Sequence, residues 1–85
     1  MKIDITTTTI VNGQKSVIIE KNIDSANDIR VEMLKDIKGC FKSWQILDYI
    51  FDYECGQTKH GYKVVKTMRQ HKETKETVIT EFDYN

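Results

Sequence analysis

The chain has 85 residues, 39% of them hydrophobic, and its 13 basic side chains balance 13 acidic ones. This length predicts a single domain over residues 1–85, and the hydrophobic content excludes wholesale disorder. The balanced charge argues against a nucleic-acid binder that depends on a strongly positive overall charge. No apolar run has the length of a signal peptide or of a membrane span, so we expect a cytoplasmic protein with reduced thiols.

The first predicted elements are two strands, residues 2–11 and 15–23, joined as a hairpin. Both are rich in Ile, Val and Thr, and Asn12-Gly13 between them is a strong hairpin signal. A strict two-residue turn would divide the aliphatic side chains of the two strands between the two faces. A turn with one bulged residue brings these side chains onto one face, and we prefer it: Ile3, Ile5, Val11, Val17, Ile19 and Ile23.

The next predicted element is a helix over residues 24–38. Asp24 or Ser25 is suited to cap its start, and Gly39 is suited to the position after its end. Apolar side chains recur at helical spacing along it: Ala26, Ile29, Met33, Leu34 and Ile37.

The segment Trp44–Glu54 is the densest block of large apolar and aromatic residues, and its pattern fits either a strand or a helix. Its residue types are typical of strands, and Asp52 and Glu54 would lie at the unfavourable negative end of a helix dipole. We therefore predict a strand, with a second helix over residues 43–55 as the alternative.

Residues 55–61 are predicted to form a loop, followed by a hairpin of residues 62–71 and 76–84. The register that fits both apolar and charged side chains sets four pairs opposite each other: Val65 and Phe82, Lys66 and Glu81, Met68 and Ile79, His71 and Glu76.

These elements predict an α+β fold in the order ββαβββ. We expect a five-stranded, mainly antiparallel sheet with the single helix packed on one of its faces. With residues 43–55 as a helix, the order becomes ββααββ.

The sequence offers no combination of residues that indicates catalysis, a metal or a cofactor. Cys40, Cys55, His60 and His71 lack the close spacing of a zinc site, and the glycines form no phosphate-binding loop. We therefore expect no catalytic residues, no cofactor and no enzymatic activity.

A basic segment, residues 59–75, predicts one binding surface. Basic side chains with an aromatic among them are suited to a phosphate backbone, and the candidate residues are Lys59, Tyr62, Lys63, Lys66, Arg69 and Lys72. The strands expected on either side carry acids that would neutralise much of this charge, so a nucleic-acid-binding module is the alternative function.

The predicted face of the sheet away from the helix supplies the preferred surface. It combines apolar side chains with a charged pair, as protein interfaces do: Ile46, Ile50, Val64, Lys66, Met68, Ile79 and Glu81. We therefore predict a non-enzymatic interaction module that binds a protein partner or itself as a homodimer. The residue usage resembles that of AT-rich genomes, which fits a small inhibitor encoded by a phage or a mobile element.

Overall fold

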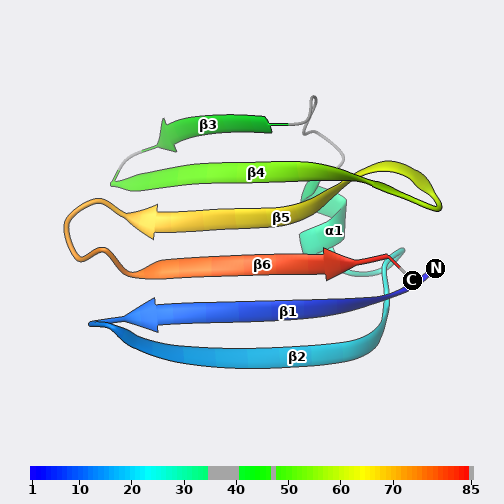
Figure 1. Ribbon diagram of the computed structural model, residues 1–85, viewed down its shortest axis with the longest axis horizontal. Coiled ribbons are helices and arrows are strands. Elements are labelled where there is room, and N and C mark those ends of the chain that lie inside the picture. Colours follow the sequence, from blue (N-terminus) through cyan, green and yellow to red (C-terminus); the bar gives the residue numbers. More distant parts are fainter. Residues whose placement is uncertain (35–40, 47, 85) are drawn as a thin grey trace.

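A computed structural model describes residues 1–34, 41–46 and 48–84. Within these residues, six antiparallel strands form one open sheet in the order β2-β1-β6-β5-β4-β3 (Figure 1). Their bounds are β1 Lys2–Val11, β2 Gln14–Asp24, β3 Phe41–Ile46, β4 Tyr49–Thr58, β5 Gly61–His71 and β6 Thr77–Asp83. The antiparallel sheet of the predicted fold is confirmed, with six strands instead of five.

The sixth strand arises because the segment Trp44–Glu54 is a hairpin and not one strand. β3 ends at Ile46, Asp48 lies in a turn, and β4 begins at Tyr49. Trp44 and Phe51 are therefore opposite each other on neighbouring strands. The alternative with a second helix over residues 43–55 is wrong, because this region is almost entirely strand.

The predicted loop over residues 55–61 is also wrong. β4 continues to Thr58 and β5 begins at Gly61, so only Lys59 and His60 form the turn. The ladder between β4 and β5 shifts register at Glu54 and Cys55. This bulge changes which face the following side chains occupy.

The first hairpin has the strict two-residue turn. Asn12 and Gly13 have φ values of 50° and 77°, as a type I′ turn requires, and Val11 is opposite Gln14. Val17 and Ile19 are opposite Thr8 and Thr6, so they lie on the other face from the buried residues of β1. The predicted bulge at this turn, with all six aliphatic side chains on one face, is wrong.

A bulge does occur at the far end of this hairpin. Ile3 is opposite Ile23 while Ile5 is opposite Glu20, so β2 has an additional residue beside Asp4. Asn22 has a φ of 56° there, and its N–H donates to a carboxylate oxygen of Asp4 at 3.0 Å. The bulge turns Ile23 back towards the core.

The register of the last hairpin is confirmed. Lys66 is opposite Glu81 and Met68 is opposite Ile79. Beyond the ladder, the His71 N–H donates to the Glu76 carbonyl at 2.9 Å. Cross-strand pairing of charges and of apolar side chains was sufficient to fix this register.

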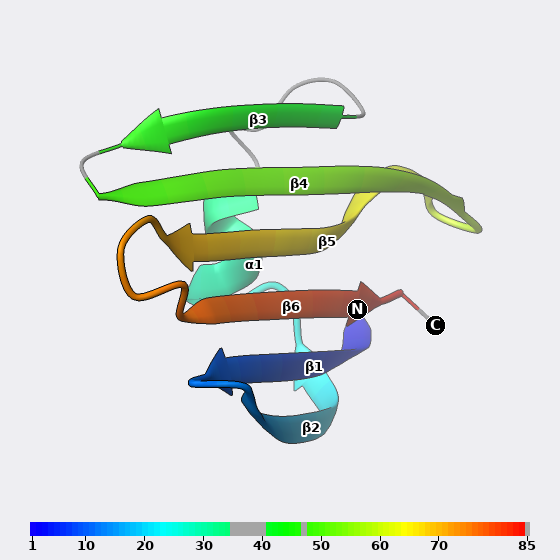
Figure 2. The ribbon, with the colours of Figure 1, turned by 60° about the vertical axis from the view of Figure 1, so that its left-hand side comes forward.

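The predicted helix over residues 24–38 is confirmed only for a short central part, α1 (Ile29–Met33). Residues 35–40 lie outside the described residues. Asp28, and not Asp24 or Ser25, caps the helix: its carboxylate accepts from the Arg30 N–H at 2.9 Å. Figures 1 and 2 show α1 on one side of the sheet, and no described element covers the other side, which we call the open face.

A buried core lies on the side of the sheet where α1 is found. Ile3 and Ile5 are 0% exposed, and Phe82 and Tyr84 complete the buried cluster. Partly buried hydrophobic side chains pack against it: Ile23, Val31, Leu34 and Val65. The helix-facing side of β1, β5 and β6 therefore provides the hydrophobic centre that holds the sheet.

Candidate interaction surfaces

The open face of the sheet holds part of the predicted partner surface. Met68 and Ile79 are opposite each other and half-buried, as is Ile50 on β4. Lys66 lies between Glu54 on β4 and Glu81 on β6, and all three are exposed. This face therefore combines partly covered apolar side chains with charges of opposite sign on neighbouring strands.

One of the predicted residues, Val64, is not part of this surface. Val64 is 7% exposed and lines a cavity on the helix side, because the bulge at Glu54 and Cys55 turns it to that face. The backbone register sets Ile46 opposite Tyr49, and the predicted role of the Ile46 side chain lies outside the described residues. The predicted patch therefore loses Val64.

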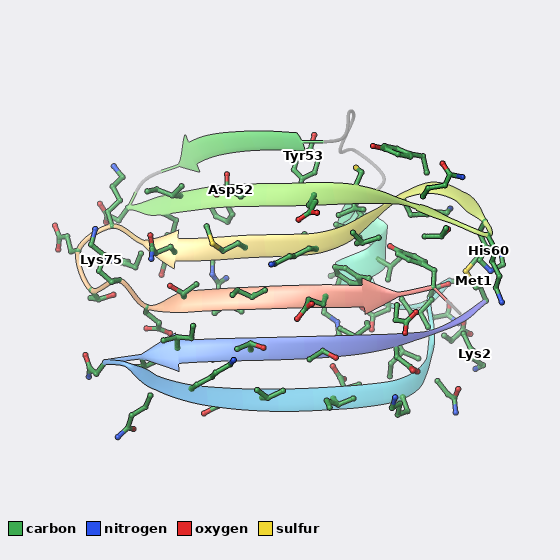
Figure 3. The ribbon with its side chains drawn as sticks, in the orientation of Figure 1. Met1, Lys2, Asp52, Tyr53, His60 and Lys75 are labelled. Atoms are coloured by element: carbon green, nitrogen blue, oxygen red, sulfur yellow. The ribbon has the colours of Figure 1, made fainter. Side chains whose placement is uncertain are left out.

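The structure does not bring the predicted nucleic-acid residues together. Lys59 is in the β4–β5 turn and Lys72 is in the β5–β6 turn, at opposite ends of the sheet, which His60 and Lys75 mark in Figure 3. Lys66 faces the open side between two acids, whereas Arg69 lies on the helix side with its guanidinium 5.6 Å from the centre of the Tyr49 ring. Lys63 and Tyr62 line the cavity beneath α1.

The most exposed apolar stretch in the described chain is on β2, which forms one edge of the sheet. Val17, Ile18 and Ile19 are 51%, 62% and 59% exposed. Val17 and Ile19 lie on the open face and Ile18 on the helix face, so both sides of this strand are apolar in its middle. In the part of the chain that the structure describes, β2 has a neighbour on one side only, β1.

The backbone of β2 has an unpaired edge. In an antiparallel ladder alternate residues direct their N–H and C=O groups to the same side, and the pair that closes a two-residue hairpin turn bonds across the ladder. Starting from Val11 and Gln14, the alternation directs the backbone groups of Lys15, Val17 and Ile19 away from β1. An exposed edge of this kind is a template for another strand.

Charged side chains flank this apolar centre. Lys15 and Lys21 lie on the same face as Val17 and Ile19, at either end of them, and both are exposed. The Lys21 ammonium is 3.2 Å from a carboxylate oxygen of Asp4 but its side chain is still 69% exposed.

On the helix face, β2 is tied to α1 by charge. The Arg30 guanidinium bonds to the Glu20 carboxylate and, through Nη2 at 2.6 Å, to Asp28. The hydrogen bonds from Arg30 hold the pKa of Asp28 below its ordinary value. The Glu20 carboxylate is thus bonded within the molecule, whereas the Lys15 and Lys21 side chains of β2 are exposed and Lys21 is also paired with Asp4.

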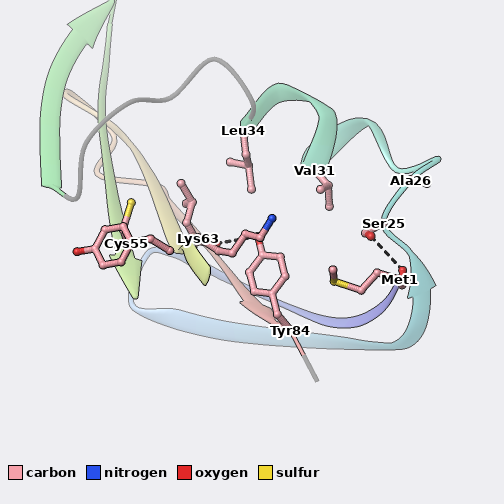
Figure 4. Close-up of a pocket in the computed structure, with 10 residues that line it drawn as sticks. Met1, Ser25, Ala26, Val31, Leu34, Cys55, Lys63 and Tyr84 are labelled. Atoms are coloured by element: carbon pink, nitrogen blue, oxygen red, sulfur yellow. Dashed lines mark hydrogen bonds between the residues drawn. The ribbon is translucent and has the colours of Figure 1, made fainter. Parts of the chain in front are cut away.

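A cavity of about 390 Å³ lies between α1 and the sheet (Figure 4). Its walls are mainly apolar and include Val31, Leu34, Val64 and Tyr84, with the Cys55 thiol and the Lys63 side chain at one side. The Tyr84 hydroxyl donates to the Val64 carbonyl at 2.8 Å. This cavity is the loosely filled end of the core.

The sequence itself contains a signal for the exposed edge. Val17-Ile18-Ile19 is a continuous apolar run, whereas a strand with one buried face alternates with polar residues. The bulged turn predicted from the sequence places Val17 and Ile19 in the core, and in that register the run does not indicate an exposed surface. With the strict turn at Asn12-Gly13, the same run becomes an exposed edge.

No protein-family model, no curated protein and no solved structure matches this chain. No helix within residues 1–34, 41–46 and 48–84 is long and apolar enough to cross a membrane.

Proposed function

We propose that this chain is a non-enzymatic interaction module that binds an extended segment of a partner protein by adding it as a strand beside β2. The observation that carries the proposal is the exposure of Val17, Ile18 and Ile19 on an edge without a neighbouring strand in the described chain. Strand addition supplies backbone hydrogen bonds for affinity and alternate side-chain contacts for specificity.

The edge of β2 is a better candidate than the open face. The apolar side chains of that face are half-buried among their neighbours, whereas those of β2 are each more than half exposed. Natural sheets usually protect a long edge with proline, a charge in its middle or a covering segment. The middle of β2 contains neither a proline nor a charged residue, and Figure 1 shows β2 at the border of the sheet.

A proline at position 17 tests strand addition directly. The Val17 N–H points outward, so Val17→Pro removes one donor for the incoming strand without removing a bond to β1. We expect binding of short valine- and threonine-rich peptides to weaken about tenfold, since a lost hydrogen bond costs about 0.5–1.5 kcal/mol and the ring obstructs the approach. Titrations monitored by backbone NMR shifts provide both the affinity and the site.

Val17→Thr is the matched control, because it keeps the N–H and the β-branched shape. A peptide N-methylated at consecutive central residues provides a second test on the unmodified protein, since both of its edges then lack N–H donors for the ladder. If the N-methylated peptide binds as well as its parent, or if the shifts map to the open face, strand addition at β2 is wrong.

A further inference from the structure

We infer that the strand received by β2 carries acidic residues on both sides of an apolar centre. This inference rests on the proposed function and specifies the chemistry of its partner. Lys15 and Lys21 are each three positions from Ile18, and they share one face with Val17 and Ile19. A complementary strand therefore has, on that face, acid, apolar, apolar and acid at alternate positions.

The spacing of the lysines also disfavours a second copy of this chain as the occupant. Two β2 strands related by a twofold axis pair antiparallel and keep their faces, so residues of the same face are opposite each other. Centring the pair on Ile18 matches Val17 with Ile19 but sets Lys15 opposite Lys21 at both ends. Moving the centre by one residue sets Ile18 opposite Ser16 or Glu20 and loses the apolar match.

Charges of opposite sign on the partner remove this conflict. Each lysine is exposed, and acidic neighbours directly opposite lysine are favourable cross-strand pairs. The Asp4 carboxylate already compensates part of the Lys21 charge, so the Lys15 end of the strand contributes more to the selection of acid.

A series of three heptapeptides tests the inference on the intact protein. The parent is Glu-Thr-Val-Val-Val-Thr-Glu, which is symmetric and so presents acids to both lysines in either strand direction. The controls replace both glutamates by glutamine or by lysine. At low salt we expect affinity to fall about fivefold from glutamate to glutamine and about fivefold again to lysine, as for two exposed ion pairs.

Salt and a lysine variant distinguish charge from other effects. At about 0.5 M salt the screening length is about 4 Å, so the three affinities should converge. In the double variant Lys15→Gln/Lys21→Gln, the glutamate peptide should bind no more tightly than the glutamine peptide. The affinity of the glutamine peptide should be the same as for the unmodified protein. Equal binding of all three peptides to the unmodified protein at low salt would overturn the inference of an acidic partner but would leave the proposal of strand addition intact. Failure of all three to bind would overturn both proposals.

Discussion

At the scale of single residues, Tyr84 connects the end of the chain to the core. Its ring belongs to the buried cluster with Ile3, Ile5 and Phe82, and its hydroxyl bonds to the Val64 carbonyl of β5. Burial, with a smaller electrostatic contribution from Cys55, raises the pKa of Tyr84 above its ordinary value. This one side chain therefore links packing, hydrogen bonding and pH dependence.

Replacing Tyr84 by phenylalanine should lower the free energy of unfolding by about 1–2 kcal/mol, because the buried Val64 carbonyl loses its donor while the ring stays. Denaturant unfolding at neutral pH measures the loss. The matched control is Tyr62→Phe, which removes a hydroxyl from a ring that is 54% exposed and should change stability by less than about 0.5 kcal/mol.

Comparison of wild type with Tyr84→Phe should also show a dependence of stability on pH. The folded protein holds the Tyr84 proton to higher pH than the unfolded chain does, because the folded pKa is raised. The free energy of unfolding contributed by this group is therefore complete below about pH 10 and is lost as the pH rises through the folded pKa. Wild type should lose more stability than Tyr84→Phe over this range; parallel curves would contradict a raised pKa.

Single residues also show why the candidate surface was only partly predictable. Met68 and Ile79 were placed correctly because their register follows from local pairing within one hairpin. The predicted face of Val64 is wrong because β5 itself has a bulge: Glu54 is opposite Lys66 and Cys55 is opposite Val64, so Val65 is an additional residue. Sequence alternation assumes an unbroken ladder, and nothing in residue type alone indicates where the additional residue is inserted.

At the scale of elements, the β1–β2 turn determines which side chains are exposed. Asn12 and Gly13 both adopt positive φ, and this turn sets Val17 and Ile19 on the face away from Ile3 and Ile5. The type I′ turn was recognisable from Asn-Gly, but the assumption that every aliphatic side chain is buried favoured a bulged register. A strand with apolar residues on both faces breaks that assumption.

Replacing Gly13 by alanine should destabilise the protein by about 1 kcal/mol through the backbone alone. Gly13 has a φ of 77°, and a Cβ added there would meet no atom within 4 Å, so steric contact does not contribute. Gly13→Asn is the control, since asparagine tolerates the left-handed region and should recover much of the loss. Denaturant unfolding compares the three proteins, and an alanine variant as stable as wild type would be inconsistent with this turn.

The segment Trp44–Glu54 shows a second limit on what the sequence alone predicts about the elements. Asp48 interrupts a block of strand-forming residues, but one acidic residue fits equally well on the exposed face of a continuous strand. Its hairpin is evident only when β3 pairs with β4 and sets Trp44 opposite Phe51. Tertiary pairing, which no local pattern contains, decided between one strand and two.

At the scale of the whole molecule, the open sheet has two ends, and the β2 end combines an apolar centre with flanking lysines. In the proposed mode of binding, the lysines attract an acidic segment and oppose the alignment of two copies. Under that proposal, selection of a partner and avoidance of self-association have the same physical cause.

Reversing one charge should convert the edge into a self-complementary one. In Lys15→Glu, the twofold pairing centred on Ile18 sets the introduced carboxylate opposite Lys21 at both ends, so attraction replaces repulsion while the apolar match is unchanged. We expect this variant to form dimers at low salt at concentrations where wild type is monomeric, with dimerisation at least about fivefold stronger. Sedimentation equilibrium measures both proteins.

Two controls, added salt and a charge reversal at another position, identify the cause of dimerisation in Lys15→Glu. Added salt should weaken dimers of Lys15→Glu and strengthen the weaker association of wild type, because screening removes attraction in one and repulsion in the other. Lys59→Glu changes net charge equally but lies in the β4–β5 turn, so it should behave as wild type. If Lys59→Glu also dimerises, net charge rather than the β2 edge governs association, and the lysines flanking Ile18 lose their assigned role.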